Sequence, residues 1–177
     1  VAAIVVLGVL GGVRWNRGPA WRETHGAVAE IEPGVALTAP AAGELAIGCA
    51  GYADLVAAPR TEFTAPTSPG RWIGRGIGTH LTRGELRLRT REKFVGRILA
   101  INAPQADVVA TDGTFLVRAS GDSTIVAVLS GTAHILVAHG APVDVGAGER
   151  AATSGGPAIK SPLNHDDRAS LERLSTM

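Results

Sequence analysis

Residue types that could carry catalysis are few in this chain and widely spaced. The five histidines are scattered over 177 residues, and none lies at ligand spacing from carboxylates or from the single cysteine, Cys49. One cysteine cannot build a thiolate metal site or an intrachain disulfide. No Gly-x-Ser-x-Gly nucleophile motif occurs, and the serines lie mainly in turn-like segments. We therefore expect no catalytic residues, no cofactor and no metal, and we do not expect an enzyme.

One segment is strongly basic. Residues 71–97 contain eight Lys and Arg but only Glu85 and Glu92 as acids. Period-two alternation there predicts an antiparallel strand with leucines on one face and Arg87, Arg89 and Arg91 on the other. These arginines could keep an exposed, unpaired strand soluble. Alternatively, they form a docking patch for anionic lipid headgroups or for an acidic partner protein.

The overall composition narrows the class of protein. Apolar residues make up 45% of the chain, aromatic residues 4%, and the formal net charge is +1. This is sufficient for one domain with its own core and too apolar for a disordered chain. It lacks the basic field and the stacking surfaces of most nucleic-acid binders, so nucleic acid is not an expected partner.

The first segment, residues 1–17, is predicted to be the C-terminal part of a transmembrane helix and its flank. Thirteen residues without a polar side chain, Val1 to Val13, precede the expected interfacial anchor of Arg14, Trp15 and Arg17. The run is shorter than the about 20 residues that cross a bilayer, but the sequence begins at Val rather than Met. A signal-peptide hydrophobic region or a buried element are the alternatives. Residues 18–34 are interpreted as a connector.

Residues 35–160 have the pattern of an all-β domain. Short apolar runs alternate with Gly, Pro, Asp and Ser at intervals of about 8 to 12 residues, as in solenoids and sandwiches. Asp112-Gly113 and Ser130-Gly131 are interpreted as corners between short strands. Residues 64–78, rich in Pro and Gly, are predicted to form a surface loop.

The tail, residues 161–177, is predicted to contain one short helix from His165 to Ser175. Asn164 is a suitable N-cap, and acids in the first turn suit the helix dipole. Leu171 and Leu174 mark its narrow apolar stripe. The helix is expected to be either a lid on the β domain or a docking peg for another chain.

Several motifs together resemble the FecR domain of bacterial envelope proteins. They are Gly84-Glu85-Leu86-Arg87-Leu88, Gly113-Thr114-Phe115-Leu116-Val117, Val126-Ala127-Val128-Leu129-Ser130-Gly131 and Val145-Gly146-Ala147-Gly148-Glu149. The resemblance covers roughly residues 36–153. It implies an all-β domain without catalytic residues or cofactor, on the extracytoplasmic side of a single membrane span. Known members relay the occupancy of an outer-membrane receptor to a sigma factor.

The sequence thus predicts a non-enzymatic, single-span membrane protein whose periplasmic β domain binds other proteins at a bacterial inner membrane. We expect an accessory or structural subunit of a larger membrane complex, for example a respiratory or photosynthetic one. The alternative is a FecR-like transmembrane signal transducer that regulates a sigma factor. The expected partners are an integral membrane complex or envelope proteins, and the bilayer through the N-terminal span. The candidate docking residues are Arg87, Arg89, Arg91, Leu171 and Leu174.

Overall fold

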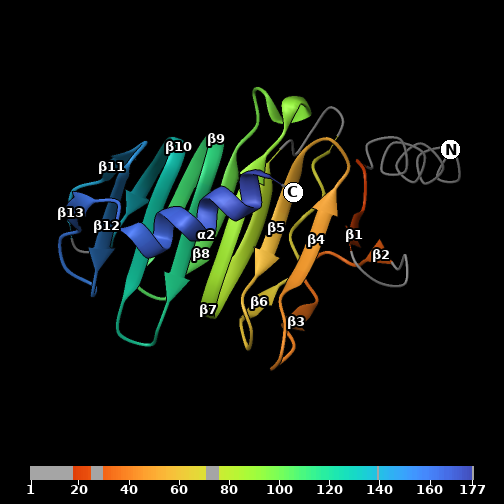
Figure 1. Cartoon of the computed structure of the whole chain (residues 1–177), viewed down its shortest axis with the longest axis horizontal. Helices are drawn as coiled ribbons and strands as arrows, with labels where there is room; N and C mark the ends of the chain where they lie inside the picture. The colour runs from red at the N-terminus through yellow and green to blue at the C-terminus, as the bar shows by residue number, and fades with distance from the viewer. Residues whose placement is uncertain (1–17, 25–29, 71–75, 139, 177) are drawn as a thin grey trace, which may run out of the picture.

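The computed structural model describes residues 18–24, 30–70, 76–138 and 140–176, which form a β-rich body with one α-helix (Figure 1). The predicted span and its anchor of Arg14, Trp15 and Arg17 lie outside the described residues. The strands are β1 (Trp21–Glu23), β2 (Glu30–Ile31), β3 (Ala36–Thr38), β4 (Leu45–Cys49), β5 (Ala53–Ala57), β6 (Glu62–Thr64), β7 (Ile77–Thr90), β8 (Leu99–Ala103), β9 (Ala106–Ala119), β10 (Thr124–Leu136), β11 (Val143–Gly146), β12 (Glu149–Thr153) and β13 (Ile159–Pro162). A short 3-10 helix, η1 (Glu92–Phe94), precedes β8, and α2 (His165–Ser175) follows β13.

The strands form one hydrogen-bonded sheet that is mostly antiparallel. Its path runs β13-β12-β10-β9-β8-β7-β5-β4-β1-β2, while β11 pairs with β10, and β6 pairs with both β3 and β7. β9 pairs with β8 along its first half and with β7 along its second half. β10 follows β9 through both halves. β9 and β10 therefore extend through two parts of the sheet, one beside β8 and one beside β7. The main core lies between these two parts of the sheet.

Glycines mark the bends of the three long strands. Gly84, Gly113 and Gly131 have φ values of 97°, 118° and 81°, a region that other residues rarely adopt. A Cβ on Gly113 would lie 2.1 Å from the carbonyl oxygen of Ser130, and one on Gly131 would lie 2.4 Å from that of Asp112. The register between β9 and β10 also shifts beside Gly131. These glycines permit both the bend and the close approach of the two backbones.

The core is built from side chains that alternate along the strands. In β7, Leu86 and Leu88 are buried, as the period-two pattern predicts. They pack with aromatic residues from other strands, including Trp21, Phe63 and Phe115. A separate, smaller apolar cluster lies on the other face of the sheet, beneath α2. The sheet therefore has a main core between its two halves and a second covered face.

The predicted fold class is wrong. It placed short strands in a solenoid or sandwich after a transmembrane helix. That predicted helix lies outside the described residues, among which no helix is long and apolar enough to cross a membrane. The sheet is a single open one, in which β7 and β9 have 14 residues and β10 has 13. Gly113 and Gly131 bend continuous strands instead of ending short ones. The C-terminal helix forms at the predicted residues, His165–Ser175.

Candidate functional site

The basic strand β7 is central in the sheet and is not an unpaired edge. It pairs with β5 on one side and with β9 on the other. The interpretation of its arginines as protection for an exposed strand is therefore wrong. Arg87 is only 3% exposed, and its guanidinium lies 2.5 Å from Glu44 Oε1 and 3.5 Å from Glu85 Oε1. Arg91, just after the strand, instead pairs with Asp54 on β5, at 2.5 Å.

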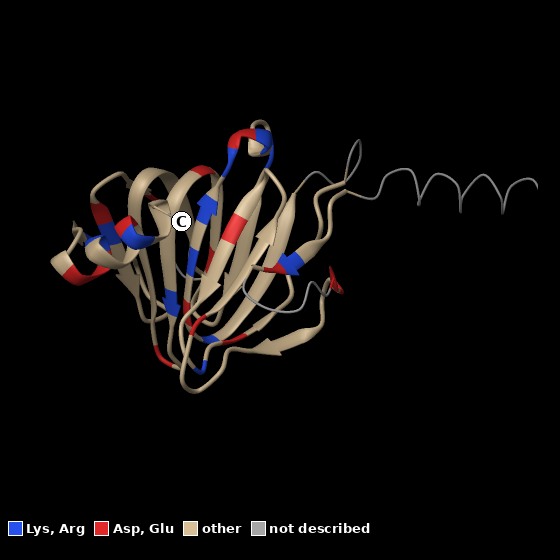
Figure 2. Ribbon diagram, turned by 45° about the vertical axis from the view of Figure 1, so that its right-hand side comes forward, with Lys and Arg blue, Asp and Glu red and all other residues tan. Residues whose placement is uncertain are grey.

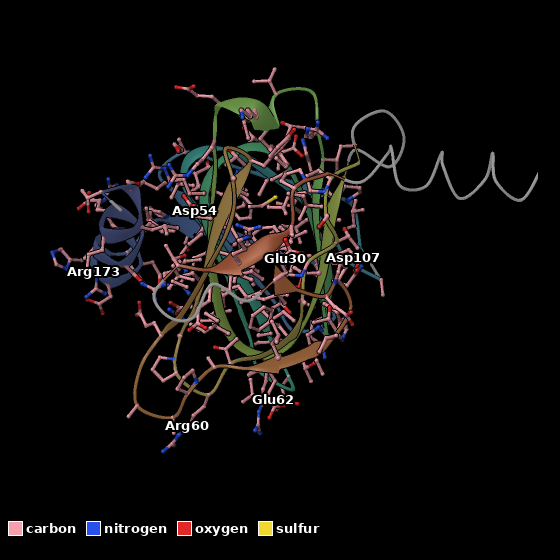
Figure 3. The ribbon with its side chains drawn as sticks, turned by 90° about the vertical axis from the view of Figure 1, so that its right-hand side faces the viewer. Glu30, Asp54, Arg60, Glu62, Asp107 and Arg173 are labelled. Carbon is pink, nitrogen blue, oxygen red and sulfur yellow. The ribbon has the colours of Figure 1, made fainter. Side chains whose placement is uncertain are left out.

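The helix α2 covers this arginine-bearing face. It crosses the sheet in Figure 1, and in Figure 3 it lies on one side, with Arg173 pointing away from the sheet and Asp107 on the opposite side. Its first turn is capped, because the Asn164 side chain accepts a 2.8 Å hydrogen bond from the backbone N–H of Asp167. At the other end, Arg89 Nη1 donates to the carbonyl oxygens of Leu174 and Ser175, at 3.3 and 2.7 Å. The Leu174 carbonyl also accepts a hydrogen bond from the backbone N–H of Thr176, the C-cap residue, so Arg89 adds a second C-terminal cap that is supplied by the sheet.

The apolar part of this contact is small. Leu171 and Leu174 are buried, and Leu171 belongs to a cluster with Leu116 of β9 and Ala127 of β10. The remaining members are Leu163, just before the helix, and the partly buried Leu129. None of these side chains belongs to the main core. Two leucines of α2 therefore provide most of its hydrophobic attachment.

A chain of ion pairs supplies the rest. The Asp167 carboxylate is 1% exposed and accepts a 3.0 Å hydrogen bond from Arg118 of β9. The same guanidinium donates two bonds, of 2.6 and 2.9 Å, to Glu85 Oε2 on β7. Arg150 of β12 lies 3.7 Å from the other oxygen of Asp167. Figure 2 shows Lys and Arg, in blue, on several strands as well as on the C-terminal helix.

The electrostatics hold the guanidinium of Arg118 in its charged form. Burial alone lowers the pKa of Arg118, but its hydrogen bonds and charge attraction to Glu85 and Asp167 outweigh burial and raise the pKa above its usual value. Arg118 therefore stays cationic at any physiological pH. It links the sheet to the first turn of the helix through two carboxylates.

The structure brings four of the five candidate docking residues into or beside one interface within the chain. Arg89 donates to the backbone carbonyl of Leu174, and the side chains of Leu171 and Leu174 are buried beneath the helix. Arg87 lies next to Glu85, and Arg91 pairs with Asp54 instead. Docking of these residues to another protein stays a prediction. The sequence interpretation missed Arg118, Arg150 and the buried role of Asp167. A usable signal was Leu116, an apolar residue on the face opposite to its buried neighbours Phe115 and Val117, which indicates a second covered face.

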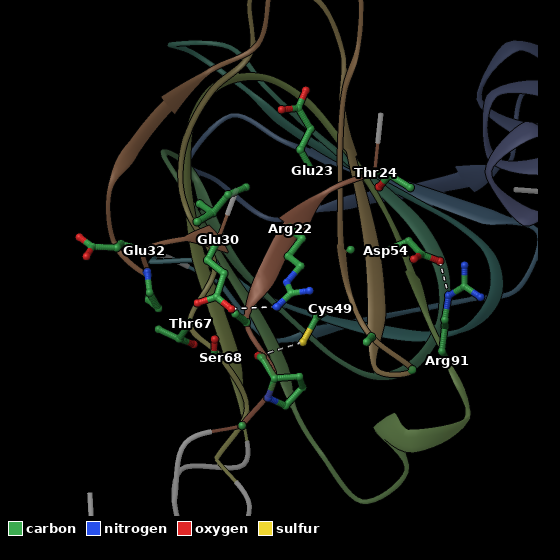
Figure 4. Close-up of a pocket in the computed structure, with 18 of the residues that line it drawn as sticks. Arg22, Glu23, Thr24, Glu30, Glu32, Cys49, Asp54, Thr67, Ser68 and Arg91 are labelled. Carbon is green, nitrogen blue, oxygen red and sulfur yellow. Dashed lines mark hydrogen bonds and ion pairs between the residues drawn. The ribbon is translucent and has the colours of Figure 1, made fainter. Parts of the chain in front are cut away.

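A separate cavity of about 1460 Å³ lies beside β1 and the hairpin of β4 and β5 (Figure 4). Its charged lining is largely paired, with Arg22 2.9 Å from Glu30 and Arg91 on Asp54. Cys49 also lines it, and burial raises the pKa of this thiol to about 11, against a weaker opposite effect of a nearby arginine. The thiol is therefore protonated at neutral pH and is a poor nucleophile.

The described histidines do not assemble a metal centre. His134 Nδ1 lies 2.6 Å from Asp144 Oδ1 in an exposed cross-strand pair, and His165 lies beside Asp166. Within the described ranges, no three His, Cys, Asp or Glu side chains converge as metal ligands.

Together these features define a predominantly β domain whose outer sheet face is occupied by its own C-terminal helix. No protein-family model and no curated protein matches the sequence. The fold is similar to that of two crystal structures of proposed anti-sigma factors from Parabacteroides distasonis, with TM-scores of 0.61 and 0.58 and sequence identities of 16% and 14%. Each match covers 73% of this chain and 60% of the solved chain. The chain thus shares a fold with these proteins over only part of their length.

Proposed function

We propose that this chain is a protein-binding regulatory domain of a signal transducer that controls a sigma factor. The observation that carries the proposal is the shared fold with two proposed anti-sigma factors over 73% of the chain. It favours the transducer over the accessory-subunit interpretation, for which the fold offers no separate support. The FecR-like motifs agree with this choice, since the resemblance implies the same kind of protein.

The site supports binding rather than catalysis. The most organised side chains outside the core are the arginines and carboxylates between the sheet and α2, and they hold a helix. The cavity beside β1 contains paired charges and a protonated thiol. We infer that the domain acts by contact with other proteins, without chemistry of its own, on the extracytoplasmic side that the resemblance implies.

The test is transcriptional. The full chain is overproduced in its native host, and transcripts are compared with those of a host producing Gly113→Val, a variant that cannot form the β9 bend. We expect the unmodified chain, and not the variant, to change the transcripts of one sigma-factor regulon. Arg83→Ala, which removes an exposed pair with Glu62, should act like the unmodified chain. A host in which no sigma-factor regulon responds would contradict the proposal.

A further inference from the structure

We propose that α2 is a replaceable occupant of a helix-binding face, and that a partner protein binds the same face with a helix of similar chemistry. The partner helix would carry a carboxylate in its first turn and two apolar residues three positions apart. The inference rests on the proposed function only in taking the partner to be a protein. We define the α2 seat as the six sheet residues Arg89, Leu116, Arg118, Ala127, Leu129 and Arg150.

The first support is the composition of the contact. The buried side of α2 consists of Asp167, Ser170, Leu171 and Leu174, so half of it is polar. Its apolar cluster is separate from the main core. An isolated helix of 11 residues is marginal in water, so α2 is helical because it is docked. Release of α2 would therefore melt the helix and leave the core packing of the sheet in place.

The second support is that the charges of the seat complement those of α2 at both ends and so define the direction of the helix. Arg118 and Arg150 meet the carboxylate of Asp167 in the first turn, whereas Arg89 meets the carbonyl oxygens of the last turn. The seat thus recognises an acidic helix start at one end and a helix C-terminus at the other. A partner helix that satisfies these arginines must lie in the same direction as α2.

The third support is the way α2 is attached. Only Leu163 and Asn164 separate it from β13, whose four residues are all exposed. β13 pairs with β12 alone and forms one end of the sheet path. The helix and its connection therefore lie at the periphery of the fold. Displacement of α2 requires no change in β7, β9 or β10, which carry most of the seat.

The experiment uses the full chain and a fluorescein-labelled peptide of residues 163–176 as the probe. In Leu171→Ala/Leu174→Ala the internal helix competes less, and we expect the probe to bind about tenfold tighter than to the unmodified chain. Val95→Ala, at an exposed apolar side chain away from the seat, is the matched control and should bind like the unmodified chain. Fluorescence anisotropy measures the affinities.

Charge reversal tests the recognition itself. Arg118→Glu, placed in the double-alanine chain, should lose the probe and bind a probe that carries Asp167→Lys. In parallel, hydrogen exchange on the unmodified chain should show the amides of α2 exchanging about tenfold or more faster than those of β9. This measurement needs no variant, so it remains decisive if a variant fails to fold.

Three results would overturn the inference. They are equal probe affinity for the double-alanine and unmodified chains, equal binding of both probes by the Arg118→Glu chain, and exchange of α2 as slow as that of β9. Formation of a dimer that exchanges α2 between two copies would also overturn it, because the occupant would then be a second copy. If the probe binds as expected but no sigma-factor regulon responds, the proposed function fails and this inference stands.

Discussion

The ion pair between Arg118 and Asp167 offers the sharpest test of how α2 is held. Arg118→Ala leaves Asp167, which is 1% exposed, with only Arg150 at 3.7 Å. Breaking a fully buried pair costs about 3–5 kcal/mol. The Arg118 side chain is 40% exposed, so solvent screens part of this ion-pair energy. We therefore expect Arg118→Ala to lower the free energy of opening of α2 by about 1.5–2.5 kcal/mol. In a double-mutant cycle with Asp167→Ala, we expect a coupling energy of about 1–2 kcal/mol.

The assay must report on α2 itself, because the helix opens before the sheet unfolds. Native-state hydrogen exchange of the α2 amides gives the free energy of local opening for each variant. The control is the exposed pair of Arg83 and Glu62, at 2.6 Å. A double-mutant cycle on this pair should give a coupling energy of less than about 1 kcal/mol. If the effects of Arg118→Ala and Asp167→Ala simply add within about 0.5 kcal/mol, the pair does not hold the helix and the reasoning is refuted.

Three further predictions concern the rest of the fold. Gly113→Ala should lower the free energy of unfolding in urea by about 2 kcal/mol or more, because its Cβ would lie 2.1 Å from Ser130 O at a left-handed φ; an unchanged midpoint would contradict this. Cys49, with its pKa raised to about 11, should react with a thiol reagent at neutral pH only after unfolding, and its contribution to stability should be complete below its ordinary pKa and lost as pH rises towards 11. Hydrogen bonds from Lys160 and a backbone N–H lower the pKa of Glu149. The stability that Glu149 contributes is therefore present above the ordinary carboxyl pKa and is lost as pH falls through the lowered pKa. Glu149→Gln should remove this acid dependence from the hydrogen exchange of the β13 amides.

Elements set by local chemistry could be predicted from the sequence. The helix His165–Ser175 follows from a capping residue, Asn164, and acids in the first turn, all within one short segment. The inward direction of Leu86 and Leu88 follows from alternation alone. Gly113 could not be placed in the same way. A hairpin corner and a bend inside a strand need the same glycine, and the difference depends on which distant strand pairs beside it.

The candidate site shows the same limit at the level of side chains. The sequence places Arg87 and Arg89 on the correct face, but exposure depends on what covers that face. The cover is α2. Arg89 donates a hydrogen bond to Leu174 of this helix, which lies 85 residues further along the chain. Period-two reasoning about one strand contains no information on such a distant partner. Apolar residues on both faces of a strand, as at Leu116, are the signal that a cover exists.

The polar character of the α2 contact has a physical consequence for binding. An apolar stripe would hold the helix more firmly, since a buried ion pair often contributes no more to stability than well-packed hydrophobic residues. It would also accept a helix in either direction. The carboxylate of Asp167 between two arginines, and Arg89 at the opposite end, disfavour a reversed or uncharged helix, because the partly exposed Arg118 and Arg150 would lose a carboxylate and Arg89 would lose its carbonyl partners. The seat therefore gains selectivity for one helix direction and one charge pattern, at the cost of firm attachment. Weak attachment with strict selectivity is what exchange of one bound helix for another requires.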